Sequence, residues 1–313
     1  MKHTGKILSD KLVENIGKVI VGKEEVIRLI ITALLADGHV LLEDVPGTGK
    51  TKLAKALAKS MDAEFSRIQF TPDLLPTDIT GLNVYNRQKD EFVLRKGPIF
   101  TNILLADEIN RATPRTQAGL LECMEEKQAT IDGDSHTIEE PFFVIATQNP
   151  VETAGTFPLP EAQLDRFMMK LSMGALERSE ELDVLVRYME SDPLDALENV
   201  ITLEELEAAK EEASKVFVHQ CIREYIVDLV EKTRIGDAVI MGVSPRGSLA
   251  LLKCAKAYAY LDGRDYCVPD DVKAVALSVL AHRIILSYGV TDTREMVQRI
   301  INQTPVPTED FSS

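Results

Sequence analysis

The sequence predicts an α/β core, in which a mostly parallel sheet lies between helices, followed by a smaller all-helical domain. Short apolar runs alternate with helical segments in the first half of the chain, an order typical of a parallel sheet covered on both faces. After about residue 174 the strand signal fades, so we place the domain boundary between residues 176 and 177. The expected strands are 39–44, 65–70, 103–108 and 142–147, and the expected later helices are 177–190, 203–215, 219–233, 248–261 and 270–280.

The composition is that of a globular protein with an acidic surface. The chain has 313 residues, 35 Lys and Arg against 50 Asp and Glu, and a formal net charge of −15. Such a charge repels phosphate backbones and anionic lipids, so we expect no nucleic-acid partner. The four cysteines lack zinc-ligand spacing, residues 1–10 lack the apolar core of a signal peptide, and the longest apolar stretch is too short to span a bilayer. These features predict a soluble cytoplasmic protein that is not an integral membrane protein.

The first expected strand is followed by a glycine-rich turn, PGTGKT at residues 46–51, and then by a helix. Glycines let the backbone curl so that N–H groups face phosphate oxygens, and the helix start adds its positive end. Lys50 then reaches the β- and γ-phosphates, and the Thr51 hydroxyl is suited to Mg²⁺. A glycine turn without ligand is the alternative, but the strand before it and the helix after it favour a phosphate-binding loop. The full pattern has glycine at position 44; this chain has Asp44, whose carboxylate we expect to point away from the phosphates.

A second buried strand, ILLADE at residues 103–108, ends in two adjacent acids. Asp107 is placed to hold Mg²⁺ through water, and Glu108 to orient or deprotonate an attacking water. Alone this pattern is weak, because apolar strands often end at solvated acids. Together with the loop at 46–51 it predicts a nucleotide-hydrolysing site.

Two segments interrupt the alternation of strands and helices. Residues 71–100 carry several prolines and glycines around the polar turn NRQKDE, and residues 127–140 carry Asp132-Gly133, a typical hairpin turn. We therefore expect hairpin insertions near 71–100 and 127–140.

These motifs together resemble those of the AAA+ ATPases. VPGTGKT, LLADEINRA, ATQNPVE and LPEAQLDRF occur in that order. The resemblance is closer to the MoxR branch, through IVGKEEVI, IQFTPDLLPTDITG, GPIF, LLADEINRATPRTQAGLLECMEE, TIDG and GTFPLPEAQLDRF, with SPRGSLALLKCAKAYAYLDGRDYCVPDDVK resembling its lid. It covers residues from about 16 to 287. The resemblance implies an AAA+ core with a helical lid, the cofactors ATP and Mg²⁺, and a ring of identical subunits, expected to be a hexamer.

The resemblance also implies roles for five residues outside the phosphate loop. Asn149 matches the sensor 1 position, although a loop asparagine holding a turn is the alternative. Arg166 matches an arginine finger for a neighbouring subunit's γ-phosphate, or else it pairs with an acid such as Asp165. Arg246 matches sensor 2, which would touch the same subunit's nucleotide from the lid, or else it is a surface arginine at a helix start. Val21 and Gly22 match the backbone stretch that cups adenine, although a simple turn would also explain the glycine.

The expected site therefore consists of catalytic residues, nucleotide-binding residues and metal ligands. The expected function is mechanical work on another protein. By resemblance, the partner carries a von Willebrand factor A-type domain, whose metal site would bind an acidic side chain from the DGDS or NRQKDE turns. A metal-chelatase motor subunit and a low-turnover nucleotide-dependent switch or scaffold are the alternatives. The catalytic residues are Glu108, Asn149, Arg166 and Arg246; the nucleotide-binding residues are Val21, Gly22, Pro46, Gly47, Thr48, Gly49, Lys50 and Thr51; and the metal ligands are Thr51 and Asp107.

Overall fold

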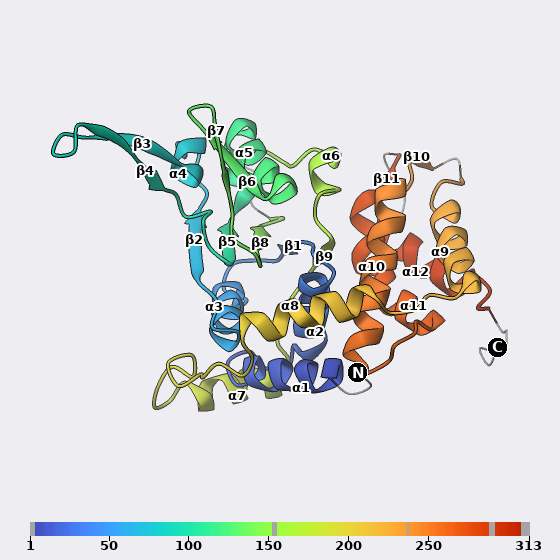
Figure 1. The fold of residues 1–313 in the computed structure, drawn as a ribbon. Helices are drawn as coiled ribbons and strands as arrows, with labels where there is room; N and C mark the ends of the chain where they lie inside the picture. The colour runs from blue at the N-terminus through green and yellow to red at the C-terminus, as the bar shows by residue number, and fades with distance from the viewer. Residues whose placement is uncertain (1–3, 152–154, 237, 288–291, 308–313) are drawn as a thin grey trace.

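A computed structural model of the chain describes residues 4–151, 155–236, 238–287 and 292–307. Its centre is a five-stranded, all-parallel sheet in the order β2-β5-β8-β1-β9 (Figure 1). This arrangement confirms the predicted fold class. The strands are β1 (Val40–Glu43), β2 (Phe65–Gln69), β5 (Ile103–Asp107), β8 (Phe143–Gln148) and β9 (Met169–Leu171).

Side chains alternate between the two faces of this sheet, and each face packs on its own hydrophobic core. Ile103 and Leu105 of β5 face a core shared with α1 (Thr4–Gly17), α2 (Glu24–Leu35) and α3 (Lys50–Ser60). Leu104 of the same strand faces a second core with α5 (Pro114–Glu126). Helices therefore cover both faces, as the near-continuous apolar strands require.

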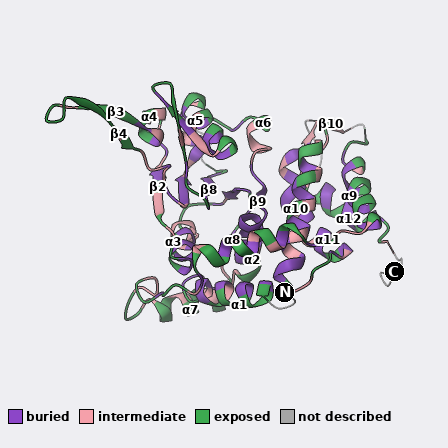
Figure 2. Ribbon diagram, viewed as in Figure 1, coloured by how far each residue is buried: buried purple, intermediate pink, exposed green. Residues whose placement is uncertain are grey.

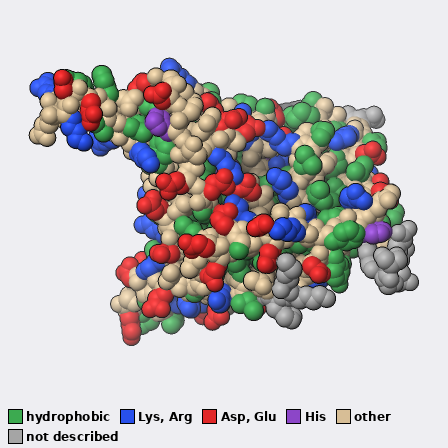
Figure 3. All heavy atoms as spheres, viewed as in Figure 1, with side chains coloured by type: hydrophobic (Ala, Val, Ile, Leu, Met, Phe, Trp, Pro, Cys, Tyr) green, Lys and Arg blue, Asp and Glu red, His purple; other side chains and the backbone are tan. Residues whose placement is uncertain are grey.

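The two segments that break the alternation are β-hairpins. The first contains the short helix α4 (Pro76–Thr80), followed by β3 (Gly81–Asn86) paired antiparallel with β4 (Glu91–Lys96). The second pairs β6 (Gln128–Ile131) with β7 (Asp134–Thr137). The β3–β4 hairpin projects from the core in Figure 1, and Figure 2 shows it mostly exposed. Figure 3 shows that it presents hydrophobic and charged side chains side by side.

The C-terminal part is helical, with one difference from the all-helical expectation. A two-stranded antiparallel ribbon joins β10 (Val239–Met241) to β11 (Ile285–Leu286). Both strands are too short to give a period-2 pattern, so the sequence offered no signal for them. The helices of this part are α7 (Arg178–Arg187), α8 (Leu203–Ser214), α9 (Gln220–Lys232), α10 (Pro245–Leu261), α11 (Pro269–Leu280) and α12 (Thr293–Gln303), and the short turn η2 (Ala281–Arg283) follows α11. The short turn η1 (Ile109–Arg111) and the helix α6 (Glu161–Leu164) belong to the core.

The helical part packs directly on the first two helices of the chain. Helix α10 contacts α1 and α2, and at Gly5 of α1 an added Cβ would lie 2.1 Å from the Tyr260 carbonyl oxygen of α10. One continuous hydrophobic core therefore runs from the sheet into the lid. The boundary at 176/177 stays a proposal, since α8 contacts α1 and α2 as well as α10. Among the described helices, none combines the length and the apolar character needed to cross a bilayer.

Candidate functional site

The loop between β1 and α3 is concave and borders a cavity. Gly47 and Gly49 have φ angles of 87° and 88°, in the left-handed region that only glycine adopts without strain. Nothing lies within 4 Å of a Cβ built on Gly47. The Lys50 ammonium donates hydrogen bonds to the carbonyl oxygens of Asp44 (2.8 Å) and Val45 (3.2 Å). Burial lowers the pKa of Lys50, although nearby carboxylates act in the opposite direction.

The carboxylate of Asp44 is turned toward the chain that follows β9, away from the loop, in agreement with the sequence-based expectation. It accepts hydrogen bonds from the Ser172 hydroxyl (2.6 Å) and from the backbone N–H groups of Met173 (2.7 Å) and Gly174 (3.2 Å). Asp44 is only 6% exposed. Its charge is therefore satisfied by three hydrogen-bond donors, as a buried carboxylate requires.

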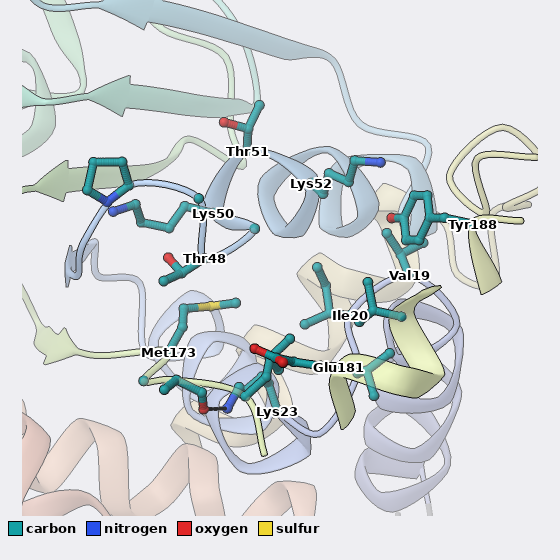
Figure 4. A pocket seen from close by; sticks show the side chains of 18 of the residues that line it. Val19, Ile20, Lys23, Thr48, Lys50, Thr51, Lys52, Met173, Glu181 and Tyr188 are labelled. Carbon is teal, nitrogen blue, oxygen red and sulfur yellow. Dashed lines mark hydrogen bonds between the residues drawn. The ribbon is translucent and has the colours of Figure 1, made fainter. Parts of the chain in front are cut away.

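A cavity of about 710 Å³ lies against this loop (Figure 4). Pro46, Gly47, Thr48, Gly49, Lys50 and Thr51 all line it. Its apolar side includes Val21 and Met173, and α7 closes another side with Glu181 and Tyr188. In the view of Figure 4, Lys50 and Thr51 lie above the cavity and Glu181 lies below it.

Gly22 does not line the cavity, unlike its neighbour Val21. Its φ is 67°, and a Cβ at this position would lie 1.8 Å from the Glu180 side chain at the start of α7. The close approach of α7 thus accounts for a glycine at this position, and the expected contact of Val21 and Gly22 with adenine stays a prediction.

Asp107 and Glu108 lie at the end of β5, on the cavity wall. The Asp107 carboxylate accepts hydrogen bonds from Arg67 on β2 (2.7 Å) and from the Thr147 hydroxyl on β8 (2.7 Å). The same Thr147 hydroxyl accepts the Glu108 backbone N–H at 2.8 Å. The two neighbouring strands therefore fix the position of both acids.

Glu108 has a left-handed backbone, with φ 56° and ψ 50°, a conformation that is uncommon for a residue other than glycine and often marks a functional position. Its Oε2 atom accepts hydrogen bonds from Gln69 Nε2 (2.7 Å) and Arg111 Nη1 (3.0 Å). The carboxylate thus has two donors from its own chain. Arg111, which the sequence left ambiguous, makes an ion pair with Glu108 in this structure.

Asn149 follows β8 and is 8% exposed on the same cavity wall. Its side-chain oxygen accepts the Val151 backbone N–H at 3.1 Å, which is the turn-holding contact of the alternative reading. Asn149 also lines the cavity together with Asp107 and Glu108. Asn149 therefore holds this turn and also lies at the site.

Arg166 and Arg246 lie together, away from this cavity. Among the described residues, no arginine lines the nucleotide-sized cavity. Both arginines pair with Glu125 at the end of α5, Arg166 through Nη1 at 3.3 Å, and both line a separate cavity of about 350 Å³. In this structure Arg246 therefore lies away from the nucleotide-sized cavity of its own subunit, and its expected contact with a nucleotide stays a prediction. The reason is the packing of α10 on α1 and α2, which holds the start of α10 beside Glu125 and away from the phosphate loop.

A buried lid arginine anchors the residue next to Arg166. Arg283 is 5% exposed and donates from Nε to the Asp165 carboxylate at 2.7 Å. It also donates to the Phe167 backbone oxygen at 2.7 Å. The lid and the chain around Arg166 are therefore connected by charge-assisted hydrogen bonds.

Comparisons with known proteins agree with this geometry. A family model described as ATPase family associated with various cellular activities (AAA) matches residues 39–169, and an AAA lid domain model matches 231–304. An uncharacterized Bacillus subtilis protein, YeaC, is 52% identical and covers 96% of each chain. Chaperone MoxR1 of Mycobacterium tuberculosis is 38% identical over 94% of this chain and 80% of its own. A solved structure from Cytophaga hutchinsonii, described as a candidate ATPase, has a TM-score of 0.89 at 39% identity and covers 97% of each chain.

Proposed function

Because this chain belongs to the MoxR family of AAA+ ATPases, we propose that it hydrolyses Mg-ATP in a hexameric ring. The ring would remodel, mature or activate a partner protein. One observation carries the ring: the described cavity beside the phosphate loop holds both acids and Asn149 but no arginine. An arginine that stabilises the transferred γ-phosphoryl group must then come from outside the subunit.

The residues around the cavity fit a nucleotide and its metal. Gly47 and Gly49 have left-handed backbones, which let successive N–H groups turn toward a phosphate, and a Cβ built on Gly47 would meet nothing within 4 Å. The Thr51 hydroxyl and the Asp107 carboxylate line the same cavity. The described residues contain no cluster of three or more His, Cys, Asp or Glu that would hold a metal alone. One hydroxyl and one carboxylate suit Mg²⁺, which is commonly bound by one or two protein groups together with phosphate oxygens. When bound, Mg²⁺ would neutralise phosphate charge.

The chain's own residues suit the hydrolytic step. Glu108 would take a proton from water while the water oxygen attacks the γ-phosphorus. The bond from that phosphorus to the ADP oxygen breaks, giving ADP and inorganic phosphate. Before this step, the Glu108 carboxylate must release the hydrogen bonds from Gln69 and Arg111 and accept one from the water. Lys50 must exchange its two carbonyl partners for phosphate oxygens.

Two substitutions test this assignment. Lys50→Ala should lose ATP binding, whereas Glu108→Gln should retain binding and lose about 10²–10⁴-fold in turnover, because a positioned base is removed. Glu122→Gln, an exposed acid on α5, is the matched control. Fluorescent-nucleotide titration and phosphate release measure the two steps. Parent-rate hydrolysis by Glu108→Gln would remove Glu108 as the base.

For the partner, we propose a protein with a von Willebrand factor A-type domain. The exposed acids Asp132 and Asp134 at the β6–β7 turn offer carboxylates to a partner's divalent cation. Pull-down by Glu108→Gln with ATP should retain such a partner, and mutation of the partner's own metal ligands should abolish retention. Retention of duplex DNA in place of a protein, at physiological salt, would contradict this proposal.

A further inference from the structure

Asp44 occupies a junction between two strand ends. Strands β1 and β9 pair in parallel, with Leu42 opposite Leu171, so their carboxyl ends reach the same edge of the sheet. Asp44 is the first residue after β1 and Ser172 the first after β9. The three hydrogen bonds that Asp44 accepts therefore connect the start of the phosphate loop to residues 172–174.

This connection joins two walls of the nucleotide cavity. Met173 and Gly174 line the cavity together with the residues of the phosphate loop. The Asp44 carbonyl oxygen is also a partner of the Lys50 ammonium. Asp44 is not among the residues with positive φ, so the backbone here does not require glycine. The aspartate thus adds a contact that a glycine at position 44 lacks.

We propose that Asp44 is a positioning residue that fixes the wall formed by residues 172–174 against the phosphate loop. This inference rests on the proposed nucleotide function for its effect on ATP. Its local effect, order in residues 172–174, does not depend on that function. The side chain acts through Met173 and Gly174 and does not touch the phosphates.

The test restores the glycine of the common loop pattern. Asp44→Gly and Asp44→Asn should bind fluorescent ATP at least about tenfold more weakly, because charge-assisted hydrogen bonds are lost. Ser172→Ala, which removes one donor and keeps the carboxylate, should weaken binding by about threefold. The Met173 and Gly174 amides should exchange hydrogen faster in the Asp44 variants, while strands β5 and β8 keep their protection. Asp228→Asn, an exposed acid on α9, is the control.

Each result decides one claim. Parent-like ATP binding and unchanged exchange at 173–174 in Asp44→Gly would overturn the proposal. If the amides of the Asp44 variants exchange hydrogen faster throughout the chain, Ser172→Ala becomes the deciding variant. Unchanged hydrogen exchange at residues 173–174 in Ser172→Ala would then also overturn the proposal. If the parent protein binds no nucleotide, the proposed function fails. The proposal for Asp44 is then tested by hydrogen exchange at residues 173–174 alone.

Discussion

At the scale of single residues, Glu108 is held by Gln69 from β2, and this contact predicts a restraint on turnover. Gln69→Ala removes the 2.7 Å hydrogen bond to the Glu108 carboxylate. A hydrogen bond to a charged group contributes about 1.5–3 kcal/mol, so the fraction of Glu108 available to water should rise about tenfold or more. Basal phosphate release should increase correspondingly. Gln88→Ala on the exposed hairpin turn is the control, and an unchanged or lower rate for Gln69→Ala would contradict the restraint.

His39 makes stability depend on pH. The ring is buried between the Met124 carbonyl oxygen and the Val144 N–H, and burial lowers its pKa from 6.5 to about 4. Because the folded-state pKa lies below the unfolded value, the contribution is fully present above pH 6.5 and is lost as pH falls toward 4. Between pH 7 and 5 this single group should cost about 2 kcal/mol of unfolding free energy.

Chemical denaturation at pH 7 and pH 5 measures that difference. His39→Gln keeps an amide donor and acceptor but has no titrating ring, so its stability should change less over the same interval. An equal pH dependence in parent and variant would show that other groups account for it.

At the scale of elements, the β3–β4 hairpin should contribute little to stability. Phe92 packs edge-on against Tyr85 at 5.4 Å between ring centroids, yet it is 71% exposed. Phe92→Ser should therefore change the unfolding free energy by less than about 1 kcal/mol. Leu120→Ala in the buried face of α5 should cost about 2–5 kcal/mol. Thermal unfolding compares the two, and a large loss for Phe92→Ser would mean that the hairpin packs on the core.

Sequence patterns predicted the features that depend on residues close together in the chain. The strand, glycine turn and helix around Lys50 follow from local periodicity and from Gly47 and Gly49. The acids at the end of β5 follow from a buried apolar run. Strand β9 was missed because Met169–Leu171 is too short for a periodic signal.

Contacts between distant segments were not predictable from local patterns. Gln69 meets Glu108 only because β2 and β5 pair in the sheet, with Gln69 opposite Asp107. The place of Arg246 depends on how α10 packs against α1 and α2. It also depends on the contact with Glu125, which lies 121 residues earlier in the chain. A polar residue at the end of the strand neighbouring Glu108 was the available signal for Gln69. For Glu125 and Arg283 the single sequence carried none.

At the scale of the whole molecule, mixed rings test whether Arg166 acts on a neighbour. Arg166→Ala should bind ATP but lose about 10³–10⁵-fold in hydrolysis. Mixing it with Glu108→Gln, which retains Arg166, should restore activity where an intact pocket meets an intact arginine. Phosphate release as a function of mixing ratio measures this recovery. Freely exchanging subunits that show none would exclude an arginine supplied by the neighbour.

The separation between the nucleotide cavity and the Arg166–Arg246 pair gives a subunit two unlike ends. Arg283 bonds the lid to the residues flanking Arg166, so a displacement of the lid would displace the arginine end as well. In a closed ring of such subunits, each cavity would receive arginines from one neighbour, and each subunit would supply its own arginines to the cavity of the other neighbour. The ring would then have a sense of rotation, and a change at one cavity would pass to the next subunit in one direction around the circle.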